Sequence, residues 1–278
     1  MAYSAEISRT NPACIILLVD QSESMAQTVG TGPSRTKAVA VADAVNDLLY
    51  DLSVRCAKPG FVDNYFHVAL IGYGRTVGSA YGGALAGRDL VPLSELAENF
   101  LEKRKMTISE TTTSGDVTQR PVSLPSWLKP AADGGTPMNR ALKHAEYLVA
   151  QWVDSYPGSF PPIVLNLTDG ESTDGDPVSA ASAIVSHATA DGMALLFNLH
   201  MSASKDAPAM FPDDIESLPN EHSRLLFRTS SILPSPMRIY AEQEGLRVSD
   251  RTRGFVYNAT INALAKFLEI GTRATDLR

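Results

Sequence analysis

The chain alternates between short, largely apolar runs and longer segments in which apolar residues recur at helical spacing. Residues 13–19 are seven apolar residues in a row, and comparable runs at 163–167 and 193–199 predict strands that are buried on both faces. Apolar stripes with helical spacing predict helices at 38–52, 138–152, 178–188 and 261–268. Because helices of this length separate the strands, the connections are crossovers and the sheet is expected to be mostly parallel.

Weaker patterns fill the remaining segments. We expect strands at 67–73 and 254–257, and a short edge strand at 76–81. Helices are expected at 92–105 and 236–244.

The predicted fold class is α/β, with a doubly wound, mostly parallel central sheet and helices on both faces. The pattern favours a single domain over residues 1–278. A segment at about 84–133, whose part from 106 onward is polar and rich in turn residues, is expected to be an elaboration of this fold. The segment at about 202–250 maps onto no expected element apart from the helix near 236–244.

Composition restricts the class of partner. The net charge is −7 and no basic stripe stands out, which argues against a nucleic-acid partner. No apolar run reaches membrane-spanning length and the first residues lack the features of a signal peptide, so a cytoplasmic protein without membrane contact is expected. Cys14 and Cys56 lie within apolar patterns and are expected to be core thiols.

The most informative polar residues follow the first predicted strand. Asp20, Ser22 and Ser24 stand at alternate positions directly after the apolar run. A carboxylate and two hydroxyls on a loop at a strand tip suit a hard divalent cation, above all Mg²⁺.

Two other loops are expected at the same edge of the sheet. Thr136 lies in Gly-Gly-Thr-Pro before a predicted helix, and Asp169 lies in Thr-Asp-Gly-Glu after the predicted strand at 163–167. In open α/β sheets, ligands bind beyond the carboxyl ends of the strands. The chain therefore offers two carboxylates and three hydroxyls for one cation.

These three motifs, in this order, resemble those of a von Willebrand factor type A (VWA) domain. The matching elements span roughly residues 12–200, and the last strand and helix are similar to the sixth repeat of the family. The resemblance implies a Rossmann-like VWA fold with an intact metal-ion-dependent adhesion site. It implies Ser22, Ser24 and Thr136 as metal ligands, with Asp20 and Asp169 contributing directly or through water. Mg²⁺ is the implied cofactor, with Mn²⁺ or Ca²⁺ as alternatives.

The resemblance also implies a function. A protein partner would supply an Asp or Glu that completes the metal shell, so the chain is expected to bind proteins and not to be an enzyme. The chain is similar to stand-alone cytoplasmic VWA proteins of bacteria, which occur in multiprotein stress or defence systems.

Each residue also has a local alternative. Asp20 and Asp169 could end strands, Ser22 or Ser24 could cap a turn, and Thr136 could cap a helix.

Other functions stay open at this point. A second metal site could be formed by Glu171, Asp174 and Asp176, but we favour their interpretation as turn and helix-start residues. A Mg²⁺-dependent phosphohydrolase could use the same strand-tip acids, but Ser22 stands where a familiar design has a second acid. No phosphate loop, H-E-x-x-H or G-x-S-x-G motif is present. A scaffold that the metal only stabilises is a third alternative.

Overall fold

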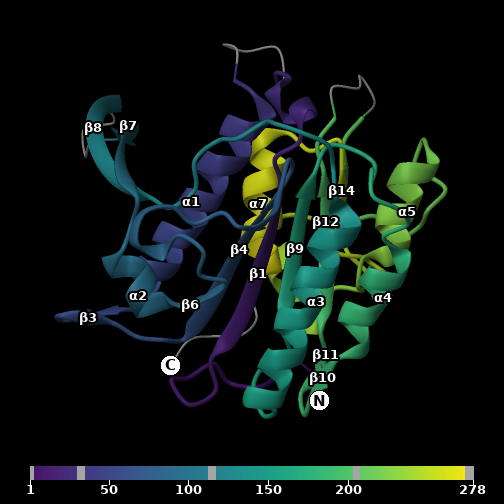
Figure 1. Cartoon of the computed structure of the whole chain (residues 1–278), viewed down its shortest axis with the longest axis horizontal. Helices are drawn as coiled ribbons and strands as arrows, with labels where there is room; N and C mark the ends of the chain where they lie inside the picture. The colour runs from purple at the N-terminus through teal and green to yellow at the C-terminus, as the bar shows by residue number, and fades with distance from the viewer. Residues whose placement is uncertain (1–2, 30–34, 112–116, 203–206, 273–278) are drawn as a thin grey trace.

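A mostly parallel sheet with helices on both faces forms the centre of the computed structural model (Figure 1). The structure describes residues 3–29, 35–111, 117–202 and 207–272, and within them this sheet has eight strands. The strand order is β13-β14-β12-β9-β1-β4-β5, with β6 also paired to β4. The α/β fold class predicted from the alternating pattern is therefore confirmed.

Five parallel strands make up the middle of the sheet. They are β1 (Ala13–Asp20), β4 (Phe66–Tyr73), β9 (Ile163–Thr168), β12 (Leu195–His200) and β14 (Phe255–Tyr257). The antiparallel strands are β5 (Val77–Ser79), β6 (Leu90–Pro92) and β13 (Ala209–Met210). All eight residues of β1 are buried, because β4 and β9 flank it and helices cover both of its faces.

Side chains alternate along β1 and so divide the core into two layers. Ile15, Leu17 and Val19 pack in the layer formed with the first and last helices, whereas Ile16 and Leu18 pack in the opposite layer. The first layer contains α1 (Lys37–Arg55), α2 (Leu93–Glu98), α6 (Ser235–Gln243) and α7 (Ile261–Gly271). The second contains α3 (Met138–Ser155), α4 (Val178–Ser186) and α5 (Glu221–Thr229).

The segment between β6 and α3 differs from the sequence-based expectation. The helix predicted at 92–105 is only α2, and residues 102–105 belong to a strand. This strand, β7 (Glu102–Thr111), pairs with β8 (Val117–Ser126) in an antiparallel hairpin that projects from the body of the molecule (Figure 1). The hairpin is a separate two-stranded sheet whose partly buried face mixes the charged Arg104 with the apolar Met106, Val122 and Leu124, so the apolar alternation in its sequence is weak. The hairpin lies within the elaboration expected at 84–133, of which residues 112–116 lie outside the described part.

The smaller elements connect these parts. They are the short strands β2 (Ala57–Lys58), β3 (Phe61–Val62), β10 (Ala188–Thr189) and β11 (Gly192–Met193), with the 3-10 turns η1 (Glu23–Ala26) and η2 (Gly83–Leu85). The helix expected at 236–244 is confirmed as α6, and the rest of 202–250 contributes α5 and β13. Cys14 and Cys56 are buried, unpaired thiols, as expected.

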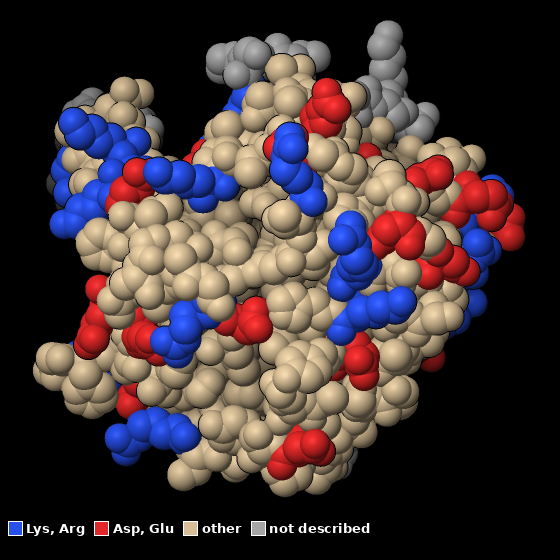
Figure 2. Space-filling model, viewed as in Figure 1, with Lys and Arg blue, Asp and Glu red and all other residues tan. Residues whose placement is uncertain are grey.

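Charged side chains are spread over the visible face of the molecule (Figure 2). Basic side chains gather over the β7–β8 hairpin, whose first strand begins Glu-Lys-Arg-Lys. Over the rest of this face acidic and basic groups are interspersed. Among the described helices, none is both long and apolar enough to cross a bilayer.

Candidate metal site

The loops after β1 and β9 meet where the strand order of the sheet reverses. Starting from β1, the chain adds β4 on one side and later adds β9 on the other. Ligands of open α/β sheets bind at such a switch point, beyond the carboxyl ends of the strands. Asp20 is the last residue of β1, and Asp169 directly follows β9.

The carboxylate of Asp20 organises the turn after β1. Its Oδ1 accepts the backbone N–H of Ser22 at 2.9 Å. Ser22 precedes the 3-10 turn η1, but its side chain makes no capping hydrogen bond there. Instead, the hydroxyl oxygens of Ser22 and Ser24 lie 3.0 Å apart. The two serine hydroxyls therefore face each other.

Asp169 joins this pair from the loop after β9. The Ser24 hydroxyl donates to Asp169 Oδ1 at 2.6 Å. Thr168, the last residue of β9, donates its hydroxyl to Asp20 Oδ2 at 2.8 Å. The two acids and the two serines form one hydrogen-bonded group, in which Asp20 is 1% exposed and Ser22 is 2% exposed.

Thr136 lies beside this group. Its backbone N–H donates to the Thr173 hydroxyl at 3.0 Å, and its carbonyl accepts the Thr173 N–H at 2.9 Å. It does not cap α3, whose N-cap position is Pro137. Its Oγ1 lies 3.5 Å from the position that a Cβ on Gly170 would take, next to the turn that carries Asp169. The local alternative of a helix cap is therefore wrong for this residue.

Backbone hydrogen bonds hold the loop before α3 against the loop after β1. The Asp133 N–H donates to the Gln21 carbonyl at 2.7 Å, and the Glu23 N–H donates to the Gly134 carbonyl at 2.9 Å. The Arg75 N–H donates to the Asp133 carbonyl at 2.8 Å, which adds the turn after β4. Three loops that are distant in sequence are thereby fixed around one site.

We expect a methyl group at Gly74 to disturb this arrangement. A Cβ there would lie 2.6 Å from the Gln21 carbonyl oxygen and 2.7 Å from that of Asp133, and backbone atoms cannot swing away. Gly74→Ala should lower the free energy of unfolding by about 1–3 kcal/mol and weaken Mg²⁺ binding, measured by denaturant titration and calorimetry. Gly78→Ala is the matched control, because its Cβ would meet no atom within 4 Å. Equal behaviour of the two variants would contradict the positioning role of Gly74.

Burial shapes the electrostatics of the site. It raises the pKa of Asp20 to about 6, and the nearby charge of Asp169 acts in the same direction. The hydrogen bonds from Ser22 and Thr168 oppose this shift. A carboxylate whose charge is disfavoured by burial gains most from a nearby cation.

Lys37 is a residue of this site that the motifs do not include. As the first residue of α1, it directs its Nζ to Asp169 Oδ2 at 2.8 Å and to Gln27 Oε1 at 2.9 Å. A signal was present in the sequence, because Lys37 precedes Val41 and Val45 at intervals of four on the apolar face of the helix. The sequence does not show which acid such a lysine would meet.

Two of the three acids considered for a second metal serve helix starts. The Asp174 carboxylate accepts the N–H groups of Asn139 and Arg140 at 3.0 Å each, at the beginning of α3. Asp176 accepts the Val178 N–H at 2.9 Å at the beginning of α4. The favoured interpretation of Asp174 and Asp176 as turn and helix-start residues is confirmed.

Comparison with known proteins places the fold. No protein-family model and no curated protein matches the chain. A von Willebrand factor type A protein from Catenulispora acidiphila has a similar fold at 14% identity, with a TM-score of 0.47, 95% of this chain covered and 43% of that chain. Proximal thread matrix protein 1 from the mussel byssus matches at 12% identity, with a TM-score of 0.50, 97% of this chain covered and 48% of that chain.

The structural neighbours include von Willebrand factor type A domains. A further neighbour is the vWF domain of the type V pili tip protein Mfa5 from Porphyromonas gingivalis, at 12% identity and a TM-score of 0.31, with 58% of this chain covered and 39% of that chain. These likenesses concern the fold alone. The chain spans less than half the length of the solved chains named above.

The residues present fit the hard cation that a VWA-like fold implies. Two buried carboxylates supply the charge that a dication requires, and the hydroxyl oxygens around them are hard ligands. Among the described residues, no three His, Cys, Asp or Glu side chains converge on one point. A cation at this site would therefore depend on the hydroxyls of Ser22, Ser24 and Thr136 as well as on the acids.

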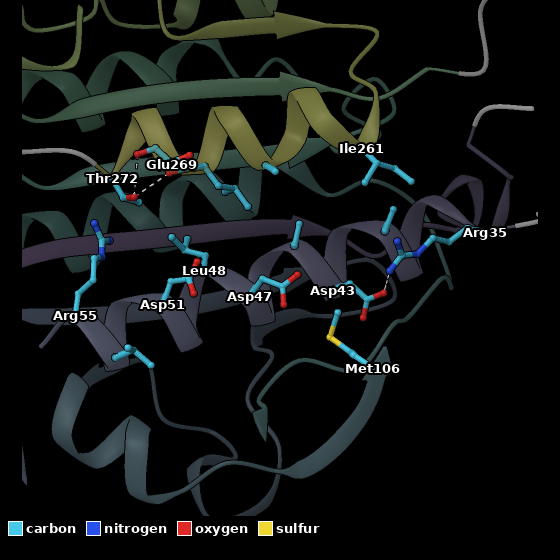
Figure 3. Close-up of a pocket in the computed structure, with 15 residues that line it drawn as sticks. Arg35, Asp43, Asp47, Leu48, Asp51, Arg55, Met106, Ile261, Glu269 and Thr272 are labelled. Atoms are coloured by element: carbon cyan, nitrogen blue, oxygen red, sulfur yellow. Dashed lines mark hydrogen bonds and ion pairs between the residues drawn. The ribbon is translucent and has the colours of Figure 1, made fainter. Parts of the chain in front are cut away.

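A cavity of about 400 Å³ lies between α1 and α7 of this VWA-like fold and is separate from these residues (Figure 3). Asp43, Asp47 and Asp51 line it from successive turns of α1. Arg104 of the hairpin pairs with Asp43 and Asp47, and Arg35 also pairs with Asp43. None of the predicted metal ligands lines this cavity.

Proposed function

We propose that this chain is a protein-interaction module whose binding depends on Mg²⁺. The metal would be held by Asp20, Ser22, Ser24, Thr136 and Asp169, with Mn²⁺ or Ca²⁺ as substitutes. The VWA-like fold supports an interaction module, and one observation carries the metal site: buried carboxylates and hydroxyls from separate loops form one hydrogen-bonded group at the switch point.

The roles of the individual residues follow from their chemistry. The hydroxyls of Ser22, Ser24 and Thr136 would be direct ligands, while Asp20 and Asp169 would neutralise the cation directly or through water. Thr168 orients the Asp20 carboxylate by its hydrogen bond to Oδ2. When bound, Mg²⁺ would supply a Lewis-acidic centre that can take an Asp or Glu of another protein as a ligand.

Affinity capture tests this proposal. The purified chain would be immobilised and exposed to a soluble extract of its source in Mg²⁺ or in EDTA, and the Ser22→Ala variant would be exposed in Mg²⁺. We expect specific proteins only on the wild type in Mg²⁺, identified by mass spectrometry, because truncation of Ser22 removes a metal ligand and leaves the backbone of the turn in place. Capture of the same proteins in EDTA would overturn the proposal.

The same preparations separate binding from catalysis. A phosphatase assay with Mg²⁺ and Mn²⁺ should show no turnover above that of the Ser22→Ala variant. If the captured proteins belong to a stress or defence assembly, they would extend the proposal to a cytoplasmic role in such a system.

A further inference from the structure

A lysine ammonium is bound to the second carboxylate of the candidate metal site. Lys37 Nζ lies 2.8 Å from Asp169 Oδ2, and the other oxygen of Asp169 accepts the Ser24 hydroxyl. The Lys37 side chain is 3% exposed and that of Asp169 is fully buried. The side-chain oxygen of Gln27 also accepts a hydrogen bond from the ammonium, and the backbone carbonyl of Gln27 accepts the Lys37 backbone N–H at 2.8 Å.

Neither its burial nor its place on the helix favours a lysine at this position. Lysine is almost never fully buried unless it is paired, because removing its charge from water is costly. As the first residue of α1, Lys37 also lies at the positive end of the helix dipole, where anions and not cations are stabilised. Asp169 is the acid that pairs with it, so the lysine is best explained by the charge of the site.

The charge of Lys37 acts at the strand tips. Its ammonium lies 2.8 Å from an oxygen of Asp169, which directly follows β9. The ammonium therefore contributes positive potential where the metal would bind.

We infer that Lys37 is a built-in cation of the metal site; this inference rests on the proposed function above. With no metal bound, Lys37 neutralises Asp169 and leaves Asp20 as the single uncompensated acid. With Mg²⁺ bound, the two acids and the two cations leave one net positive charge. Lys37 thus stabilises the metal-free fold, weakens metal binding by repulsion, and gives the loaded site its preference for an anionic partner group.

Replacing the ammonium by an uncharged side chain of similar length tests this inference. We expect Lys37→Met to lower the melting temperature in EDTA by at least about 5 °C, because it leaves the buried Asp169 carboxylate without its ion-pair partner. The same variant should bind Mg²⁺ or Mn²⁺ at least about tenfold more tightly by calorimetry, because the repulsion is gone. Mg²⁺ should therefore raise its melting temperature more than that of the wild type.

Two further variants keep the test decisive. Lys37→Gln retains a donor toward Asp169 without the charge, so it should show the tighter metal binding even if Lys37→Met does not fold. Lys129→Met removes an exposed lysine that lies 3.6 Å from Glu102 and should leave both measurements unchanged.

The outcomes distinguish this inference from the proposed function. If the wild type binds metal and the Lys37 variants bind it no more tightly, the role of Lys37 is overturned and the metal site stands. If only the Lys37 variants bind metal, the lysine replaces the metal in the wild type; this supports the inference and overturns the proposed function. If none binds metal, both are overturned.

Discussion

In the absence of metal, Asp20→Asn is expected to make the protein more stable and, at the same time, unable to respond to Mg²⁺. At neutral pH the buried Asp20 carboxylate is charged at a cost, because burial and the charge of Asp169 raise its pKa to about 6. Asparagine keeps an oxygen for the Ser22 N–H and removes the charge. The asparagine amide nitrogen takes the place of Asp20 Oδ2, which accepts the Thr168 hydroxyl. Thr168 can instead donate to the Gly170 carbonyl, which lies 3.1 Å from its hydroxyl.

The expected gain in EDTA is about 1–3 kcal/mol in the free energy of unfolding at pH 7, measured by denaturant titration. Mg²⁺ affinity should fall by about 100-fold or more, because one of only two acids is lost. An ordinary destabilising mutation would lower both quantities, so the opposite signs identify a residue that is kept for its charge.

The pH dependence of this effect has a definite sign. A carboxyl group whose pKa is raised on folding contributes stability that is fully present below its ordinary value of 3.8 and is lost as the pH rises through about 6. The stability difference between Asp20→Asn and the wild type in EDTA should therefore be small near pH 4 and complete by pH 7. Mg²⁺ binding by the wild type should weaken below about pH 6, because a proton on Asp20 competes with the metal.

Asp176→Asn provides the matched control. Asp176 is an exposed acid just before α4, and the side-chain oxygen of asparagine can accept the same Val178 N–H in this turn. This variant changes the net charge equally and should alter neither stability nor metal response appreciably. A loss of stability in Asp20→Asn at pH 7 in EDTA would show that the acid is structural and would contradict its role as a metal ligand.

The strand tips of this site could be predicted from sequence because each motif directly follows or precedes a strongly patterned element. The run at 13–19 places Asp20 at a carboxyl end, and the helix pattern after Thr136 places that residue on a loop. Parallel strands bring their carboxyl ends to one edge, so the topology alone makes the loops neighbours. The structure adds the hydrogen bonds that connect them.

The ion pair between residues distant in sequence and the β7–β8 hairpin could not be predicted in this way. Lys37 and Asp169 are 132 positions apart, and no local pattern selects one acid among many as the partner. The partly buried face of the β7–β8 hairpin combines the apolar Met106, Val122 and Leu124 with a charged residue, Arg104. Pro121 and Pro125 lie within its second strand. Proline is tolerated at the edge of a sheet, so its usual value as a sign of turns misleads here.

The sequence also does not show how polar residues inside apolar strands are paired. Such residues carry the second large effect on stability that we predict. Asn166 and Asn198 interrupt β9 and β12 and are directly opposite each other in register. The Asn166 amide donates to Asn198 Oδ1 at 2.9 Å, and its own oxygen accepts the Tyr73 hydroxyl at 2.7 Å, across β1. The Asn198 amide in turn donates to the Ser230 hydroxyl at 3.0 Å, just past the end of α5.

Asn166→Leu is expected to lower the free energy of unfolding by about 3 kcal/mol or more. The change leaves the Asn198 side-chain oxygen without its donor and leaves the Tyr73 hydroxyl only the longer hydrogen bond to the Leu167 carbonyl at 3.4 Å, and each poorly satisfied buried group costs about 1–3 kcal/mol. Tyr73→Phe removes only the hydroxyl and should cost less. Because the two residues share one hydrogen bond, the double variant should lose less than the sum of the two single losses. Denaturant titration of the four proteins measures this coupling.

The effect of Mg²⁺ on melting temperature distinguishes this hydrogen-bonded network in the core from the candidate metal site. Asn166 lies two residues before Thr168, the last residue of β9, and three before Asp169, and its side chain donates and accepts only within the core. Asn166→Leu should therefore keep a Mg²⁺-induced rise in melting temperature, although from a lower starting point, whereas Asp20→Asn should lose that rise from a higher one. If Asn166→Leu instead abolished the metal response while the fold stayed intact, the polar chain would be part of the site, and the separation between a stabilising scaffold and a charged binding edge would be wrong.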